Sequence, residues 1–181
     1  MRSIILTGPY GIGKTTIGRL LAESLGQPSY SLDEYAWTYY QERGLSPGIA
    51  ENLGDLDSPQ WQPYHAHAVG RFLQDHESEV CIIDLGVGHS LYEGIYLNEM
   101  QAVFALYNVI LLTPSPDIDT AIHELNTRNN THIYKRTQSH TRLNLSFLKH
   151  PSSYQFAKHI VYTKGKTPTE TLKDIFALDL K

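Results

Sequence analysis

A glycine-rich pattern that ends in a lysine and a threonine lies near the N-terminus. Residues 8–15 read Gly-Pro-Tyr-Gly-Ile-Gly-Lys-Thr and match G-x-x-x-x-G-K-[ST] at every position. Glycines let backbone N–H groups approach a diphosphate, and a helix that begins after them favours negative charge. Lys14 is expected to bind the β- and γ-phosphates of a nucleotide, and the Thr15 hydroxyl to bind Mg²⁺.

The surroundings of this pattern favour a phosphate-binding loop over a plain glycine-rich turn. It follows a short apolar run rich in β-branched residues at 2–7 and precedes helical spacing at 14–25. A strand before the loop and a helix after it are the context that phosphate binding requires. We expect nucleotide contacts from six residues of this segment: Gly8, Gly11, Gly13, Lys14, Thr15 and Thr16.

A second oxygen ligand for Mg²⁺ is expected at the end of a neighbouring strand. Asp84 ends the apolar run at 79–84 and is the candidate. A second role stays open, in which the Asp84 carboxylate caps the turn at 85–88. Thr15 and Asp84 are therefore the predicted metal ligands.

An aspartate amid many aromatic residues predicts a site for a second substrate. Asp33 ends the short strand predicted at 29–33, and its carboxylate could hold and deprotonate a hydroxyl group. Asp33 is also suited to cap the helix predicted at 34–43, so both roles stay open. About half of the nearby aromatic side chains should be core, and the rest could wall a pocket for a sugar face, a base or another ring. They are Tyr35, Trp37, Tyr39, Tyr40, Trp61 and Tyr64.

Basic residues gather in the last third of the chain. Residues 128–181 hold ten of the fifteen Lys and Arg residues but three of the nineteen Asp and Glu residues. No acidic residue lies between Glu124 and Glu170. A basic segment without countercharge attracts anions, and phosphoryl transfer is stabilised by donated Arg groups. Arg136 is the first candidate for this role. Arg128 could stack on a base or reach a phosphate, and Arg142 is a further candidate. A solvated basic face, or a surface for RNA or acidic lipid, is the alternative.

Apolar runs alternate with helical spacing along the chain. The predicted strands read as apolar runs without period-two alternation, which is typical of a parallel sheet covered on both faces. This pattern predicts a three-layer α/β/α fold with five parallel strands, in one domain over residues 1–181. Residues 44–63 are expected to be loop, with acidic residues exposed to solvent, and residues 129–151 to be polar with weak periodicity. Strands are predicted at 2–7, 29–33, 79–84, 108–112 and 159–163, and helices at 14–25, 34–43, 64–76, 91–107, 117–128 and 167–178, with a further short helix at 154–158.

The composition is that of an ordinary soluble protein, with 41% hydrophobic and 19% charged residues. It excludes wholesale disorder, collagen-like repeats and a coiled coil. A net charge of −4 argues against a general nucleic-acid binder, and no apolar run is long enough to span a membrane. The single cysteine, Cys81, excludes an intramolecular disulfide and is expected in the core. We therefore expect a cytoplasmic monomer or homodimer.

His65 and His67 are two positions apart and could bind zinc only together with further ligands. Residues two apart on a helix do not face each other, so these two histidines alone would not form a metal site.

With the phosphate loop, Asp33 and the turn Gly86-Val87-Gly88 in this order, the chain resembles the shikimate kinase family. That family has the nucleoside-monophosphate-kinase type of P-loop fold, and the resemblance runs in order over essentially the whole length. It implies an ATP-dependent kinase of a small hydroxylated molecule, with an acceptor-binding insert at 34–76 and a mobile basic lid at 126–151. It also implies that the loop ending at Pro168 borders the adenine. ATP and Mg²⁺ are the implied cofactors.

The acceptor side departs from that family. The family has Asp-x-Asp after its second strand, where this chain has Ser31 and Asp33. It has a Phe-Arg-x-x-Glu group where residues 61–65 lack both Arg and Glu, and an Arg near the late proline where this chain has Lys149 or His150. Loss of two Arg residues removes bidentate recognition of a carboxylate, so shikimate is not the expected acceptor.

Four functions therefore remain open at the level of the sequence. The favoured one is a kinase that moves the γ-phosphoryl group of ATP to a hydroxyl of a small molecule. The others are a nucleoside or nucleotide kinase, a regulatory nucleotide-binding protein without an acceptor, and an RNA-modifying kinase that uses the basic segment.

Overall fold

Five parallel strands form the sheet of the computed structural model, which describes residues 2–130 and 138–180, with side chains for 2–127 and 140–180. The order across the sheet is β2-β3-β1-β4-β5. This confirms the predicted parallel sheet. The strands are β1 (Ile4–Thr7), β2 (Ser29–Ser31), β3 (Ile82–Asp84), β4 (Asn108–Thr113) and β5 (His159–Tyr162).

Both faces of the sheet are buried, which explains why its strands read as apolar runs. Ile4 and Leu6 of β1 pack into one hydrophobic cluster, and Ile5 between them packs into the other. All three side chains are fully buried. Period-two alternation is absent because there is no solvent face to carry polar residues.

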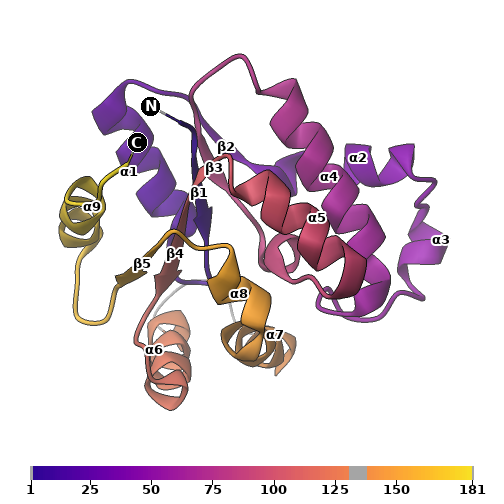
Figure 1. Ribbon diagram of the computed structural model, residues 1–181. Helices are drawn as coiled ribbons and strands as arrows, with labels where there is room; N and C mark the ends of the chain where they lie inside the picture. Colours follow the sequence, from indigo (N-terminus) through magenta and orange to yellow (C-terminus); the bar gives the residue numbers. More distant parts are fainter. Residues whose placement is uncertain (1, 131–137, 181) are drawn as a thin grey trace.

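Helices cover both faces of the sheet (Figure 1). Helices α1 (Lys14–Leu25) and α9 (Pro168–Phe176) lie on one face, and α4 (Gln62–Asp75) and α5 (Gly94–Phe104) lie on the other. The three-layer α/β/α architecture is confirmed.

Local sequence signals set the ends of α1 and α9. Gly26 ends α1 in the left-handed conformation, with φ 63°, where glycine has no steric cost. The Thr167 side chain accepts a hydrogen bond from the Glu170 N–H, and the Glu170 carboxylate accepts one from the Thr167 N–H. This capping box places Pro168 at the first helical position, as predicted.

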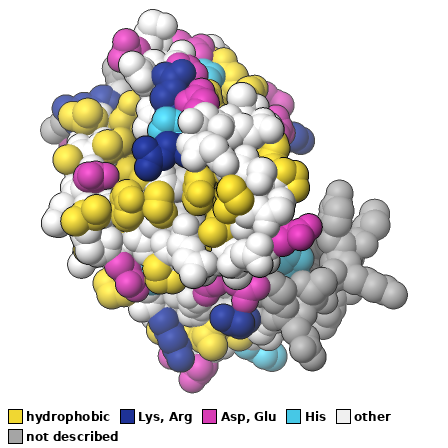
Figure 2. Space-filling view, turned by 90° about the vertical axis from the view of Figure 1, so that its right-hand side faces the viewer, with side chains coloured by type: hydrophobic (Ala, Val, Ile, Leu, Met, Phe, Trp, Pro, Cys, Tyr) yellow, Lys and Arg dark blue, Asp and Glu magenta, His cyan; other side chains and the backbone are white. Residues whose placement is uncertain are grey.

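Short elements build a layer outside α4. The 3₁₀ turn η1 (Leu32–Glu34) leads to α2 (Ala36–Glu42), which packs against α4. On the face that these elements turn to solvent, acidic, basic and hydrophobic side chains are interspersed (Figure 2). Arg71, for example, contacts both Glu42 and Asp75. The predicted loop at 44–63 contains α3 (Pro47–Ala50) and the turn η2 (Pro59–Trp61).

Three helices lie beyond the carboxyl ends of the strands: α6 (Ile118–Asn130), α7 (Gln138–Lys149) and α8 (Pro151–Gln155). The weak periodicity at 129–151 predicted no helix there, whereas the structure has α7 in this segment. Phe147 and Leu148 of α7 are buried in the hydrophobic core, and burial of such side chains outweighs the weak helix propensity of its Ser, Thr and Asn residues. The short helix expected at 154–158 lies at α8 instead.

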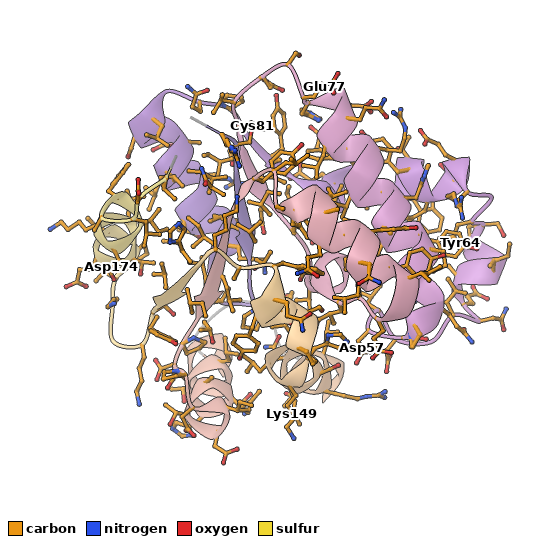
Figure 3. The ribbon with its side chains drawn as sticks, viewed as in Figure 1. Asp57, Tyr64, Glu77, Cys81, Lys149 and Asp174 are labelled. Carbon is orange, nitrogen blue, oxygen red and sulfur yellow. The ribbon has the colours of Figure 1, made fainter. Side chains whose placement is uncertain are left out.

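The remaining differences concern the ends of elements. The helix predicted at 91–107 begins at Gly94, because residues 87–90 form the turn η3 (Val87–Ser90) and Leu91 and Tyr92 pack in the core. Cys81 precedes β3 and is fully buried, as predicted, and burial raises the pKa of its thiol (Figure 3). Among the described residues, no helix is long and apolar enough to cross a membrane.

Candidate active site

The phosphate loop, residues 8–15, connects β1 to α1 and has space for a ligand because of its glycines. Gly8 has φ 152°, and a Cβ atom there would collide with the carbonyl oxygen of Leu112 in β4. Gly13 has φ 104° and stands just before the first residue of α1, where free N–H groups point out of the helix. The loop therefore has the backbone geometry of an anion site.

Lys14 lies folded along this loop. Its ammonium group donates to the carbonyl oxygens of Gly8 at 2.9 Å and Pro9 at 3.3 Å. Burial lowers the pKa of the Lys14 ammonium group, and the carboxylates of Asp84 and Asp33 partly offset that effect. A phosphate would supply the negative charge that this buried ammonium group needs.

Thr15 and Asp84 meet at the carboxyl ends of β1 and β3. Asp84 pairs in register with Leu6 of β1, and its Oδ2 accepts a hydrogen bond from the Thr15 hydroxyl at 2.5 Å. Its Oδ1 is buried and has no hydrogen-bond partner. Burial raises the pKa of the Asp84 carboxyl more than Lys14 and Thr15 lower it. The Asp84 side chain bonds to Thr15 rather than to the turn at 85–88, which disfavours the capping role.

These two oxygens fit a Mg²⁺ ion. A hydroxyl and a carboxylate are the hard ligands that Mg²⁺ prefers, and the unsatisfied Oδ1 of Asp84 is available to a cation or to its waters. A cation there would also lower the cost of keeping the Asp84 carboxylate ionised in a buried place.

A cavity of about 280 Å³ lies between α1 and α9 beside the phosphate loop. Gly11, Gly13 and Thr16 line one side of it, and Lys166 and Pro168 line the other. Four of the predicted nucleotide residues thus surround one cavity. Arg128 belongs to α6, but its side chain lies outside the described residues, as does Arg136 entirely.

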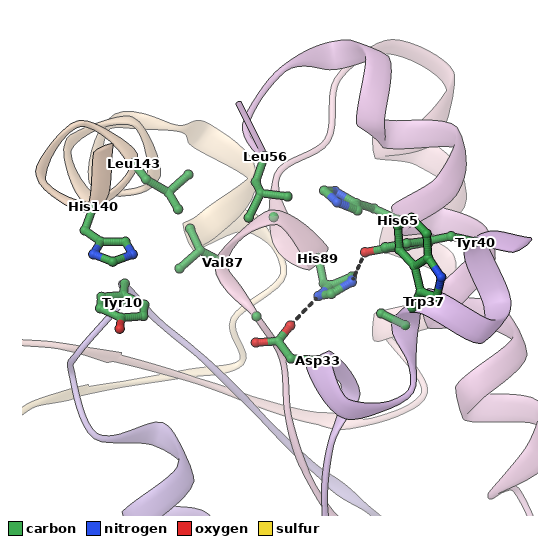
Figure 4. Close-up of a pocket in the computed structure, with 13 residues that line it drawn as sticks. Tyr10, Asp33, Trp37, Tyr40, Leu56, His65, Val87, His89, His140 and Leu143 are labelled. Carbon is green, nitrogen blue, oxygen red and sulfur yellow. Dashed lines mark hydrogen bonds and ion pairs between the residues drawn. The ribbon is translucent and has the colours of Figure 1, made fainter. Parts of the chain in front are cut away.

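A second cavity, of about 330 Å³, also adjoins the phosphate loop and contains no residue of α9 in its described lining (Figure 4). We call it the Asp33 pocket; the residues that bear on its chemistry are Tyr10, Asp33, Trp37, Tyr40, Leu56 and His89. Tyr10 belongs to the phosphate loop, so this pocket directly adjoins the candidate phosphate site.

Asp33, His89 and Tyr40 form a chain of polar contacts along the pocket wall (Figure 4). The Asp33 Oδ1 lies 3.3 Å from His89 Nδ1, and His89 Nε2 lies 2.6 Å from the Tyr40 hydroxyl. Burial and the Asp33 charge raise the pKa of Tyr40, so the tyrosine keeps its proton. The Tyr40 hydroxyl can therefore donate to His89 Nε2, while His89 Nδ1 faces Asp33.

The Asp33 carboxylate is held in place but open to the pocket. Burial alone would raise its pKa, but His89 and Lys14 bring the pKa below the ordinary value of 3.8. Its side chain is 63% exposed, whereas that of His89 is 5% exposed. Asp33 lies inside η1 and α2 has Tyr35 at its N-cap, so the helix-capping role proposed as an alternative was wrong.

Two glycines make room for this arrangement. A Cβ atom at Gly86 would collide with the Asp33 carboxylate, and one at Gly88 would lie 2.5 Å from the His65 ring. The glycine turn after β3 therefore lets two side chains from other elements reach the pocket wall. His65 is fully buried against Trp61, and burial lowers its pKa well below the ordinary value, so its imidazole is neutral.

The predicted aromatic cluster divides between pocket and core. Trp37 and Tyr40 line the Asp33 pocket. Tyr35 and Tyr39 pack against Phe72, and Tyr39 donates to Asp75, which with burial raises the pKa of Tyr39 to about 12. Trp61 and Tyr64 pack behind Tyr40.

Sequence reasoning missed three histidines and a helix that complete the site. His65 and His89 reach the pocket from α4 and η3, and His140 of α7 stacks on Tyr10 with ring centroids 4.1 Å apart. The sequence feature that could have predicted a role for His89 is its position directly after the turn Gly86-Val87-Gly88. His67, in contrast, points outward to Glu42, and the described residues contain no cluster that could hold a metal through three or more His, Cys, Asp or Glu side chains.

Helix α7 is joined directly to the phosphate loop. Asn144 is fully buried; its Oδ1 accepts from the Tyr10 N–H at 2.7 Å, and its Nδ2 donates to the Tyr10 carbonyl at 3.0 Å. Arg142 pairs with Asp55 at 2.8 Å, so this part of the predicted solvated acidic loop contacts α7. His140 and Leu143 of the same helix line the Asp33 pocket.

Replacing Asn144 with alanine is expected to destabilise the fold by about 1–3 kcal/mol, because the Tyr10 N–H loses its partner in a buried place. Each 1 kcal/mol corresponds to a decrease of about 2–4 °C in Tm for a chain of this size. Asn52→Ala is the matched control, since Asn52 is exposed and its side chain donates to the Gly48 carbonyl four residues earlier. Thermal unfolding monitored by circular dichroism measures both; equal Tm values for the two variants would contradict the assigned role.

Comparison with known proteins now adds to this geometry. A family model described as an AAA domain matches residues 3–155. The chain belongs to the AAA domain family. This AAA domain protein is 28% identical to the shikimate kinase of Streptomyces coelicolor over 179 residues, which cover 98% of this chain and 96% of the relative. It is 26% identical to the shikimate kinase of Streptomyces avermitilis, with the same coverage of both chains.

Solved structures show the same fold for this AAA domain protein. A shikimate kinase from Acinetobacter baumannii in complex with shikimate superposes with a TM-score of 0.64 at 19% identity, covering 97% of this chain and 91% of that one. A gluconokinase from Sinorhizobium meliloti gives 0.61 at 18% identity, covering 97% and 90%. The protein is thus a shikimate-kinase-like P-loop protein of the nucleoside-monophosphate-kinase type. This confirms the family and the fold expected from the sequence.

Proposed function

We propose that this protein is an ATP- and Mg²⁺-dependent kinase that transfers the γ-phosphoryl group to a hydroxyl group of a small molecule bound in the Asp33 pocket. The observation that carries the proposal is the shared wall between the two sites. Tyr10 belongs to the phosphate loop and lines the pocket that presents the open Asp33 carboxylate. A protein that only bound nucleotide would have no need for that carboxylate beside the phosphates. The names of the relatives, shikimate kinase and gluconokinase, support the same class.

Each group has a defined role in this mechanism. The N–H groups of the phosphate loop and Lys14 bind the phosphates, and Thr15 and Asp84 would hold Mg²⁺, which supplies charge neutralisation when bound. Asp33 accepts a hydrogen bond from the acceptor hydroxyl and receives its proton as the new P–O bond forms. His89 fixes the orientation of Asp33.

The lowered pKa of Asp33 is compatible with this role. A carboxylate with a pKa below 3.8 is a weak base, but it is fully ionised at neutral pH and orients the hydroxyl. Phosphoryl transfer has a loose transition state in which positioning contributes more than early proton removal. The nucleotide base would occupy the cavity beside Pro168, and a lid Arg, with Arg136 or Arg128 the proposed residue, would stabilise the transferring group.

Replacing Gly86 with alanine is expected to reduce acceptor-dependent turnover about 100-fold, because its Cβ would displace Asp33 and small misplacements near the chemistry cost that much. Nucleotide binding should be unchanged. Gly70→Ala in α4 is the control, since a Cβ atom there meets nothing within 4 Å. Steady-state kinetics with a saturating acceptor measures the effect; wild-type turnover in Gly86→Ala would contradict this geometry.

The proposal is tested by ADP formation from ATP and Mg²⁺ with and without added acceptors. Glucose, myo-inositol, adenosine, shikimate and gluconate are the initial probes. We expect at least one of them to increase ADP formation tenfold or more. A slow rate that no probe changes would overturn the kinase and favour a regulatory nucleotide-binding protein.

A further inference from the structure

We infer that the acceptor is an uncharged cyclic polyol that presents one apolar face to the pocket, and that carboxylates are rejected. The inference rests on the proposed kinase function and specifies the substrate class of the same site. It is carried by the charges and the exposed side chains of the Asp33 pocket.

The charge of the pocket opposes an anionic acceptor. Among its described lining residues, Asp33 is the only acidic residue, and neither Lys nor Arg occurs. His65 is neutral, because its buried imidazole has a pKa well below the ordinary value. A carboxylate brought beside Asp33 would meet like charge, and the described lining residues offer it no guanidinium group.

Among the described residues, the basic side chains near the site in sequence either pair with an acidic residue or lie outside the pocket. Arg142 pairs with Asp55 at 2.8 Å, and His150 lies 3.4 Å from Glu93. Lys149 is exposed at the end of α7 and does not line the pocket (Figure 3). Lys14 is close, but it is bonded to the phosphate loop, where it would serve the phosphates.

The walls of the pocket favour an apolar face on the acceptor. Tyr10, Trp37 and Leu56 are 36%, 41% and 49% exposed, and all three line this one pocket. Val87 and Leu143 add further apolar surface. Large apolar side chains left open in a small cavity are typical of a site that binds a ring by its hydrophobic face.

The polar groups fix how such a ring would lie. The Asp33 Oδ1 faces His89, which leaves Oδ2 to accept a hydrogen bond from one acceptor hydroxyl. The phosphate loop lies behind Tyr10, so the hydroxyl held by Asp33 is the one that faces the γ-phosphate. A volume of about 330 Å³ is at the small end of ligand sites, which suits a monocyclic or bicyclic compound.

Matched pairs of compounds test the charge requirement. Glucose and glucuronate share a ring and differ at one carbon, and shikimate methyl ester and shikimate differ only in the charged group. We expect the uncharged member of at least one pair to give a kcat/KM at least 100-fold higher than the acid. Equal or higher values for the acids would overturn this inference while leaving the kinase intact, as would preference for the cationic glucosamine over glucose. If no compound changed ADP formation or thermal stability, the kinase proposal and this inference would both fail.

Binding to variants gives a readout that does not depend on turnover. The thermal shift produced by the best uncharged compound, with ADP present, should be lost in Trp37→Ala, while the shift from ADP alone remains. Ile49→Ala is the matched control, because Ile49 is 43% exposed and lies outside the pocket. Asp33→Asn should raise the affinity for the acid of each pair relative to its uncharged member. An unchanged preference in Asp33→Asn, or an unchanged shift in Trp37→Ala, would contradict the inference.

Discussion

Lys14→Ala is expected to abolish stabilisation by ATP and ADP and to lower the transfer rate by about 10²–10³-fold. The ammonium group is buried in the phosphate loop and donates hydrogen bonds to the carbonyl oxygens of Gly8 and Pro9, which a bound phosphate would replace with a negative charge. Removal of one preorganised donor from a developing charge has an effect of this size. The wild type should gain about 2.7 kcal/mol when a nucleotide is present at 100 times its Kd.

Differential scanning fluorimetry with ADP and Mg²⁺ measures this loss. Lys173→Ala is the control, because Lys173 is exposed at the last turn of α9 and does not line either cavity. We expect a normal nucleotide shift in Lys173→Ala and none in Lys14→Ala. A full shift in Lys14→Ala would place the nucleotide elsewhere and remove the basis of the proposed mechanism.

Asp33→Asn is expected to reduce acceptor-dependent turnover by about 10²–10⁴-fold, the range for loss of a positioned general base. An amide accepts a hydrogen bond at its oxygen but cannot take up the hydroxyl proton. ADP binding should be unchanged, because Asp33 lines the pocket and not the cavity beside Pro168. The fold should also persist, since the Asp33 side chain is 63% exposed.

Turnover of Asp33→Asn is compared with Glu51→Gln, an isosteric change at an exposed carboxylate outside the pocket. The pH profile gives a second check. The folded-state pKa of Asp33 is below 3.8, so its carboxylate stays ionised as the pH falls from 8 to 5. Wild-type kcat/KM should therefore show no loss from Asp33 in that range. Wild-type turnover in Asp33→Asn would exclude it from the chemistry.

The phosphate loop and the sheet could be predicted from the sequence because their signals are local. The loop is eight consecutive residues, and each strand is a contiguous apolar run. The position of Asp33 after the second strand placed it at the carboxyl edge of a parallel sheet, which is where the structure has it. These predictions needed no knowledge of which distant segments meet.

The partners of Asp33 could not be predicted in the same way. His89 is 56 positions further along the chain and reaches Asp33 only because η3 and η1 follow neighbouring strands. Histidines occur at protein surfaces as well as in binding sites. Residue type alone therefore did not indicate that His89 lies in the pocket wall. The clash that a Cβ atom at Gly86 would cause with Asp33 is likewise a property of the folded chain.

Helix α7 was missed because its sequence is dominated by polar and basic residues. Leu143, Phe147 and Leu148 give it an apolar side, but Asn144 among them reads as a surface residue. In the fold Asn144 is fully buried, and its amide bonds to the backbone of Tyr10. A polar residue in a helix is normally expected at the surface, but a tertiary hydrogen bond of this kind allows it to be buried.

The most direct test of phosphoryl transfer is ³¹P NMR of the wild-type protein with ATP, Mg²⁺ and the compound that most increases ADP formation. The kinase predicts loss of the γ-phosphate signal with equal growth of a phosphomonoester signal from the phosphorylated compound. Growth of inorganic phosphate alone, at the same rate with and without the compound, would contradict transfer to an acceptor.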